Sequence, residues 1–247
     1  MSTRKFDISR VCAYHTSAMF QTLKNDIACI KTRDPAVRSL AEIFFCYPGF
    51  RAIRSHRFAH WLHRHRLRFC ARVVSDWARF FTGVDIHPAA QIGQRVFIDH
   101  GAGVVIGETT IIGDDVTIYQ GATLGGTGKE TGKRHPTVGS HVVISAGSAV
   151  LGPVKLGDYC KVGAGAVVLC DIPPYATVVG VPGRVVKLRR ACEDCVQADE
   201  VDCEDCEHCH PIPGEAGVNL DHIHLPDPVR AELDALTARI AVLEGRE

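Results

Sequence analysis

An aliphatic residue returns at every sixth position between Ile86 and Val168, and this period constrains the fold more than any other feature of the chain. The run is interrupted once, by the loop GGTGKETGKRHP at residues 125–136. Eleven of the thirteen repeat positions are Ile, Leu or Val, so the period indicates one buried residue in each unit. The repeat positions are Ile86, Ile92, Ile98, Val104, Thr110, Val116, Ala122, Val138, Ile144, Val150, Leu156, Val162 and Val168.

A period of six fits neither an amphipathic helix nor a simple strand. It suits a solenoid with three flat sides per coil, in which each unit buries its apolar side against its neighbours. The repeat therefore predicts a parallel β-helix over residues 83–190. Small residues are expected to help turn its corners, among them Gly93, Gly139, Gly157 and Gly163.

The interrupting loop is long enough to leave the coil. Ala122 and Val138 are sixteen residues apart, so about four residues beyond two repeat units, or ten beyond one, are free to form an excursion. Long loops on a regular scaffold often carry function, although a tolerated insertion is the simpler reading. The GGTGK segment alone is a weak phosphate-loop signal, because it lacks the complete pattern.

The chain has 247 residues, of which 46% are hydrophobic and 23% charged, a composition typical of globular proteins. The 28 basic residues equal the 28 acidic ones, which gives no argument for a nucleic-acid or membrane partner. No apolar run reaches the roughly 18 residues of a membrane span, and the first residues lack a signal-peptide core. We therefore expect a cytoplasmic protein whose eleven cysteines are thiols or metal ligands rather than disulfides.

The segment before the repeat, residues 1–82, reads as helical. Helices are expected over 17–31, over 35–46 with Asp34 as the N-cap, over 51–66 and over 69–81. The overall fold class is therefore α+β, with a helical region before the β-helix, a Cys-rich acidic tail over 191–225 and a last helix over 226–247. Four histidines of the helical region are assigned no chemistry, since partners at matching spacing are lacking; they are His56, His60, His63 and His65.

Three polar pairs interrupt the small and aliphatic residues of the repeat: Asp85 with His87, Asp99 with His100, and Arg134 with His135. Any one pair taken alone could decorate a solvated side of the coil. All three together weaken that interpretation, and they mark the candidate site.

Seven segments of the chain match a known family: KTRDPAV, DIHPAAQIG, IDHGAGVVIGET, TLGGTGK, KRHP, VGAGAVVL and VVGVPGRVV. By these motifs, over roughly residues 34–187, the chain resembles the serine acetyltransferases. The resemblance implies a left-handed β-helix, although the general preference for right-handed crossovers predicts the opposite hand. It also implies transfer of acetyl from acetyl-CoA to L-serine, active sites between neighbouring copies in a homotrimer or a dimer of trimers, and feedback inhibition by L-cysteine.

The resemblance assigns roles that suit this reaction. A serine hydroxyl is a poor nucleophile at neutral pH, so it needs a general base, and His100 is the candidate. Asp85 matches the position of the carboxylate that orients this base. Asp34 and Asp99 match the ligands of the substrate ammonium, and Arg134 matches the ligand of its carboxylate. His135 is expected to help bind serine or cysteine, and is the lesser candidate for a base.

Acetyl-CoA is expected to lie along the coil, where small residues let its pantetheine arm approach the backbone. Gly126, Ala146 and Ala164 fit this role, although simple corner turning explains them equally well. Arg184 and Lys187 are candidates for contacts with the cofactor phosphates.

The tail after Arg190 is not part of the resemblance. It holds eight acidic residues and no Lys or Arg between Ala191 and Cys209. Its thiols, with neighbouring histidines, have the spacing of a structural zinc site; a solvated acidic loop with free thiols and an iron–sulfur site are the alternatives. The candidate ligands are Cys192, Cys195, Cys203, Cys206 and Cys209.

The last segment, residues 226–247, has apolar residues at heptad spacing, which suits a short trimeric coiled coil or packing on the same subunit. Many members of the family end in an isoleucine that docks into cysteine synthase. This chain ends in Gly245, Arg246 and Glu247, so that partner is not expected by this route.

Other functions share parts of these patterns. The repeat alone also suits acetyltransferases for sugars or antibiotics. A zinc-dependent β-helix of the carbonic-anhydrase kind would use three histidines, and His87, His100 and His135 supply that residue type. A metal-sensing scaffold would place its function in the tail.

Overall fold

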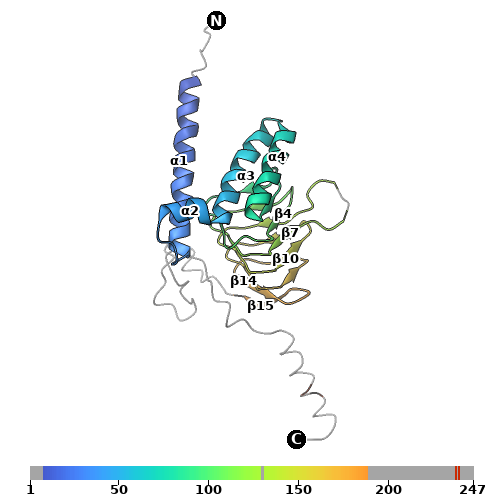
Figure 1. Cartoon of the computed structure of the whole chain (residues 1–247). Helices are drawn as coiled ribbons and strands as arrows, with labels where there is room; N and C mark the ends of the chain where they lie inside the picture. The colour runs from blue at the N-terminus through green and yellow to red at the C-terminus, as the bar shows by residue number, and fades with distance from the viewer. Residues whose placement is uncertain (1–7, 129–130, 189–236, 238, 240–247) are drawn as a thin grey trace, which may run out of the picture.

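The computed structural model describes residues 8–128, 131–188, 237 and 239. Four helices precede the strands: α1 (Ile8–Arg33), α2 (Leu40–Cys46), α3 (Pro48–Arg64) and α4 (Arg68–Thr82). Figure 1 shows α3 and α4 over one end of the coil, α1 beside it, and β15 at the opposite end. No helix among the described residues is long and apolar enough to cross a membrane.

The strands are short, and most hold only two residues. They are β1 (Asp85–Ile86), β2 (Gln91–Ile92), β3 (Phe97–Ile98), β4 (Val105–Ile106), β5 (Ile111–Ile112), β6 (Thr117–Ile118), β7 (Thr123–Gly125), β8 (Thr137–Val138), β9 (Val143–Ile144), β10 (Ala149–Leu151), β11 (Lys155–Leu156), β12 (Lys161–Val162), β13 (Val167–Val168), β14 (Ala176–Val179) and β15 (Arg184–Leu188). Up to β13 each strand pairs in parallel with the third strand after it, β12 pairs in parallel with β14, and among the described strands only β15 pairs antiparallel, with β14.

Three sheets form the three sides of the coil. Their strand orders are β1-β4-β7-β10-β13, β11-β8-β5-β2 and β15-β14-β12-β9-β6-β3. We call these the first, second and third sheets. This arrangement confirms the predicted parallel β-helix.

The repeat is interrupted twice, not once as the sequence analysis expects. From β1 to β13, successive strands start six residues apart, except that eight residues separate Phe97 from Val105 and fourteen separate Thr123 from Thr137. The first interruption is a two-residue insertion in the turn of residues 99–103. The sequence period does not reveal this insertion, because Val104 and Ile106 are both buried. Counting in sixes from Ile98 reaches Val104, an aliphatic residue, although the residue of the next strand equivalent to Ile98 is Ile106.

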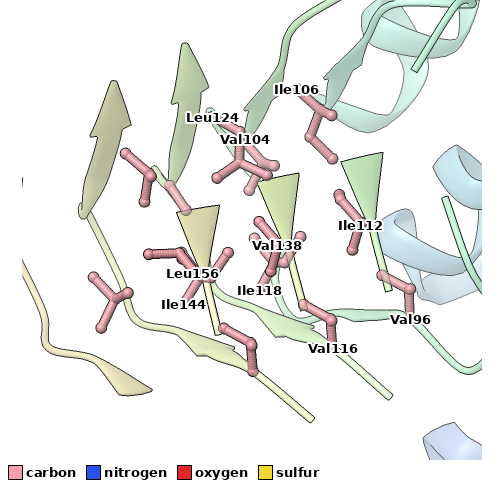
Figure 2. Close-up of a cluster of buried hydrophobic side chains, with 14 of the residues drawn as sticks. Val96, Val104, Ile106, Ile112, Val116, Ile118, Leu124, Val138, Ile144 and Leu156 are labelled. Atoms are coloured by element: carbon pink, nitrogen blue, oxygen red, sulfur yellow. The ribbon is translucent and has the colours of Figure 1, made fainter. Parts of the chain in front are cut away.

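The core of the coil is a column of inward aliphatic side chains from the three sheets, which Figure 2 shows meeting between the strands. Two of the predicted corner glycines have a different role from chain reversal, because they allow successive coils to approach closely. A Cβ added at Gly93 would lie 2.6 Å from the oxygen of Gly113, and one at Gly139 would lie 2.9 Å from the carbon of Gly157.

The second predicted helix begins later than expected, and its N-cap is Ser39 rather than Asp34. Helix α1 continues to Arg33, and α2 starts only at Leu40. The Ser39 hydroxyl accepts a hydrogen bond from the Glu42 amide at 3.2 Å. Proline disfavours the helical conformation of the residue before it, which ends α1 at Arg33. The Asp34 carboxylate accepts hydrogen bonds from the Ala36 amide and the Tyr47 hydroxyl instead of capping a helix.

Helix α1 is tied to the coil through Arg33. Its guanidinium side chain is only 3% exposed and lies 3.3 Å from the Asp115 carboxylate. It also donates to the carbonyl oxygens of Arg95 and Val116 at 3.3 Å and to the Thr117 hydroxyl at 3.0 Å. These contacts satisfy Nη1 and Nη2, while the buried Nε has no partner among the described residues, and they hold the end of α1 against the coil.

Asp115 belongs to a column of corner residues between the second and third sheets. Arg95, Asp115, His141, Tyr159 and Tyr175 all have positive φ values. Their side chains contact one another from coil to coil: Arg95 donates to Asp115 at 2.8 Å, and the rings of His141, Tyr159 and Tyr175 stack at 4.5 and 4.9 Å. These contacts help to offset the strain of a left-handed backbone at residues other than glycine.

The Asp115 network predicts an acid-sensitive contribution to stability. Burial by itself raises the pKa of Asp115, but Arg95, with His141 and Arg33, outweighs it and leaves the pKa below its ordinary value. A carboxyl with a lowered pKa stabilises the fold at neutral pH, and this contribution is lost as the pH falls below about 4. Replacing Asp115 with Asn should lower the free energy of unfolding by about 3 kcal/mol at pH 7.

Urea unfolding of both proteins between pH 3 and pH 7 measures this effect. The difference between wild type and variant should shrink on acidification, because protonated Asp115 resembles asparagine. Asp76→Asn is the matched control, since Asp76 pairs with Arg79 on the exposed face of α4 and should leave stability unchanged. An equal loss in both variants would contradict the assignment.

Candidate active site

The two-residue insertion presents His100 to solvent. The backbone of His100 is left-handed, with φ of 57°, and the next residue, Gly101, has φ of 74°. The Gly101 amide donates to the backbone carbonyl oxygen of Asp99 at 2.6 Å, which closes the turn tightly. The His100 side chain is 75% exposed, and its Nε2 lies 4.0 Å from Asp99 Oδ1. The turn therefore projects an imidazole beside a carboxylate.

Asp34 reaches this part of the coil from the end of α1. Its Oδ1 accepts a hydrogen bond from the Ala36 amide at 2.8 Å, and its Oδ2 accepts one from the Tyr47 hydroxyl at 2.6 Å. Burial, followed by this hydrogen bond and the charges of Asp34, Glu42 and Asp99, raises the pKa of Tyr47. Asp34 and Asp99 thus both act on Tyr47, although 65 positions of sequence separate them.

Helix α3 brings Tyr47 close to the coil. Tyr47 is its N-cap residue and Pro48 is its first residue. Gly49 lies against β3 so closely that an added Cβ would be 2.0 Å from the Ile98 oxygen. The helices expected over 35–46 and 51–66 leave residues 47–50 between them without a role, so Tyr47 was missed from the sequence.

Asp85 lies next to the His100 turn without bonding to it. The Gly103 amide donates to the Gly83 oxygen at 3.0 Å, and a Cβ on Gly101 would lie 2.9 Å from the Val84 side chain. Within the described part of the chain, the carboxylate beside the His100 ring is that of Asp99, and Asp85 makes no hydrogen bond to it.

A second polar cluster lies at the other end of β4, where the long loop returns to the coil. Arg134 pairs with Glu108, with 2.7 Å between Nη2 and Oε2. Thr109 joins the two chain segments of this cluster, residues 108–109 and 134–135, because its hydroxyl oxygen accepts from the amides of Arg134 and His135 at 3.1 Å each. Glu108 and Thr109 were not singled out from the sequence, although both fall within the IGET segment of the resemblance.

The contacts of His135 indicate its protonation. The Thr109 amide donates to His135 Nδ1 at 3.2 Å, so this nitrogen is an acceptor and the proton of the neutral ring lies on Nε2. Burial, and next the charge of Arg134, lowers the pKa of His135. His135 is therefore a neutral ring with a donor at Nε2, which suits substrate binding better than proton abstraction.

Gly107 makes the space that the His135 ring occupies. A Cβ at position 107 would lie 1.9 Å from His135 Cδ2 and 2.2 Å from Nε2, distances that no real contact reaches. Gly126 lies on the other side, where an added Cβ would be 3.5 Å from the same Nε2. The ring is therefore enclosed by two glycines.

His87 stands near the second cluster rather than beside His100. Its Nδ1 accepts from the Ala89 amide at 3.1 Å, and burial, followed by the charge of Arg72, lowers the pKa of His87.

No group of His, Cys, Asp and Glu in residues 8–128 and 131–188 is arranged to hold a metal ion. The predicted thiol ligands Cys192, Cys195, Cys203, Cys206 and Cys209 lie outside the described residues, as does almost all of the predicted helix over 226–247.

The small residues predicted to contact acetyl-CoA fall at two different corners. Ala146 and Ala164 lie between the third and first sheets, the corner that carries His100, and the Gly165 amide donates to the Ala146 oxygen at 2.9 Å. Gly126 lies between the first and second sheets, beside His135. Arg184 and Lys187 lie on β15, at the far end of the third sheet from β3.

These features define a hexapeptide-repeat transferase. Residues 135–170 match the family described as "Bacterial transferase hexapeptide (six repeats)", and residues 3–55 match "Serine acetyltransferase, N-terminal". A serine acetyltransferase of Synechococcus elongatus is 56% identical over 228 residues, which cover 92% of this chain and 84% of that protein. The chain belongs to the serine acetyltransferase family.

Solved structures of the family share the fold. A serine acetyltransferase in complex with cysteine is 43% identical, with a TM-score of 0.68 over 71% of this chain and 73% of that one. A serine acetyltransferase from Brucella abortus in complex with coenzyme A is 38% identical, with a TM-score of 0.69 over 72% of each chain.

The enclosure of His135 predicts that Gly107→Ala impairs serine binding without unfolding the chain. The added methyl must displace the ring, so kcat/KM for serine should fall at least tenfold, chiefly through KM. Gly113→Ala is the control, because its added methyl is also forced against the neighbouring coil, 2.8 Å from the Gly139 oxygen, but at the corner between the second and third sheets, away from His135. Serine kinetics with both variants, together with thermal melting, would contradict the assignment if Gly107→Ala left the serine KM unchanged.

Proposed function

We propose that the chain transfers acetyl from acetyl-CoA to the hydroxyl of L-serine, giving O-acetylserine and free CoA, with His100 as the general base. The observation that carries this proposal is the exposed His100 imidazole on its two-residue insertion, with the carboxylates of Asp99 and Asp34 near one phenol. Membership of the family favours serine over sugar or antibiotic acceptors.

His100 acts on the hydroxyl directly. Its exposed ring takes the proton of the serine hydroxyl as the oxygen attacks the thioester carbon, because an imidazole has a pKa near working pH. The tetrahedral intermediate then expels the CoA sulfur, which receives the proton from the imidazolium. The enzyme forms no covalent intermediate, and the ring returns to its starting state.

Carboxylates beside the base stabilise the imidazolium. Asp99 lies 4.0 Å from the ring, and Asp85 follows Val84, which contacts the next residue of the same turn. We assign Asp85 the orienting role because it matches the family position of that carboxylate and lies on β1, the strand that begins directly after Val84.

The two ends of serine are bound by opposite charges. The ammonium binds Asp34 and Asp99, and the carboxylate binds the Arg134 guanidinium and the Nε2 donor of His135. Glu108 engages only one edge of Arg134, so donors remain for a carboxylate. L-cysteine has the same two ends, and we propose that it inhibits by occupying the same positions.

One serine molecule needs residues from two copies of the chain. The His100 turn and the Arg134 cluster lie at opposite ends of β4, and the extended residues 103–107 between them span roughly 13 Å at about 3.3 Å per residue. A single serine is shorter than this. We therefore propose that the Arg134 cluster of one copy faces the His100 turn of a neighbour in a trimer of left-handed coils, or in a dimer of such trimers.

Acetyl-CoA approaches His100 along the corner of small residues. Ala164 is exposed and Ala146 is half-buried, and a Cβ on Gly147 or Gly165 would meet no atom within 4 Å. The pantetheine arm can therefore run close to this backbone toward the base. Gly126 borders the acyl end from the neighbouring copy, and Arg184 and Lys187 are assigned to the phosphates at the far end.

The general-base role predicts a specific kinetic loss. His100→Ala should lower kcat by about two to four orders of magnitude while acetyl-CoA binding stays nearly intact. Serine-dependent release of the CoA thiol measures turnover, and titration calorimetry measures cofactor affinity. Turnover near that of the wild type would remove His100 from this role.

The shared site predicts complementation between inactive chains. His100→Ala and Arg134→Ala chains, unfolded together and refolded as an equal mixture, should recover about a quarter of wild-type activity, because random assembly pairs two intact half-sites at that frequency. A mixture of His100→Ala with Asp99→Ala chains is the control, since both changes fall in one half-site. Failure of the first mixture to exceed the control would place the whole site in one chain.

A further inference from the structure

We propose that Tyr47 belongs to the serine site, where it holds the Asp34 carboxylate and supplies the third acceptor for the substrate ammonium. This inference rests on the proposed function, because it takes Asp34 and Asp99 as the ammonium ligands. Neither the repeat nor the resemblance singles out this tyrosine.

The hydrogen bond from Tyr47 fixes the direction of the carboxylate. Asp34 is held at both oxygens, by the Tyr47 hydroxyl at 2.6 Å and by the Ala36 amide at 2.8 Å. Each carboxylate oxygen accepts two hydrogen bonds, so one lone pair on each oxygen stays free for a ligand. The carboxylate can therefore receive an ammonium without turning.

The phenol remains protonated in this setting. Burial, and then the adjacent carboxylates, raises the pKa of Tyr47, so its proton stays committed to Asp34 over the working range of pH. Its oxygen keeps lone pairs for another donor. A substrate ammonium carries three N–H groups, and Asp34, Asp99 and the Tyr47 oxygen together offer one acceptor to each.

The backbone on both sides of this pair is firmly held. Tyr47 lies between α2 and α3, and the close contact of Gly49 with Ile98 leaves α3 no freedom to shift along β3. On the other side, Arg33 is bound to five oxygen atoms of the coil, among them Asp115 Oδ1. Asp34 is the next residue after Arg33, so the contacts of Arg33 with the coil also fix the position of Asp34.

The experiment compares Tyr47→Phe with Asp34→Asn and with Tyr175→Phe. Phenylalanine keeps the ring that packs against the buried cluster containing Ile43 and Phe50, and removes only the hydroxyl. Tyr175 is the matched control, because its ring stacks on Tyr159 at another corner. The measured quantities are KM for serine, KM for acetyl-CoA, and the inhibition constant of 3-hydroxypropionate, which has the hydroxyl and carboxylate of serine but no ammonium.

Tyr47→Phe should raise the serine KM about tenfold, as expected for losing a hydrogen bond to a charged group. It should leave the acetyl-CoA KM and the 3-hydroxypropionate inhibition constant within about twofold of wild type, and Tyr175→Phe should change none of the three. A merely structural role would weaken serine and 3-hydroxypropionate alike.

The experiment tests the proposed ammonium site and the role of Tyr47 separately. If Asp34→Asn leaves the serine KM unchanged, the proposed ammonium site is wrong. If Asp34→Asn raises it and Tyr47→Phe does not, the site stands and the inference about Tyr47 is overturned. Equal weakening of serine and 3-hydroxypropionate by Tyr47→Phe also overturns it. Thermal melting of each variant confirms that the fold is intact.

Discussion

The pairing of very short parallel strands is the constraint on which this structure depends. A strand such as Val105–Ile106 contributes one inward side chain and a few hydrogen bonds, so it is stable only between Asp85–Ile86 above and Thr123–Gly125 below. The sides of the coil are consequently uniform and tolerate little variation. Most of the proposed site residues of the coil lie at the corners, where a residue can be changed or added without disturbing the column of aliphatic side chains.

The three corners carry three different tasks. The corner between the third and first sheets holds His100 and the small residues below it. The corner between the first and second sheets holds Arg134 and His135, brought back to the coil by Thr109. The corner between the second and third sheets holds the stacked column to which Arg33 attaches. With the roles proposed above, this separation of the general base from the carboxylate-binding residues requires two copies of the chain for one serine site.

Much of the architecture was predictable because it repeats. The aliphatic period predicted the β-helix, and the family motifs pointed to His100 and Arg134. The insertion was hidden, since Val104 and Ile106 are both buried and the count simply changed register. Contacts made across many residues, such as Tyr47 with Asp34, leave no local pattern, and the expected cap at Asp34 failed because a tertiary partner claimed that carboxylate.

The two-residue insertion before β4 adds the His100 turn without changing the regular strand spacing on either side, which defines the fold. Strand spacing is six on either side of it, so without the insertion the first coil would have the same length as the regular coils below it. The active turn is therefore an addition to a scaffold that is already self-consistent. A lineage of such rods could gain, alter or lose this turn while the column of inward aliphatic side chains stayed the same, so that reactivity and the packing of the core would be inherited independently.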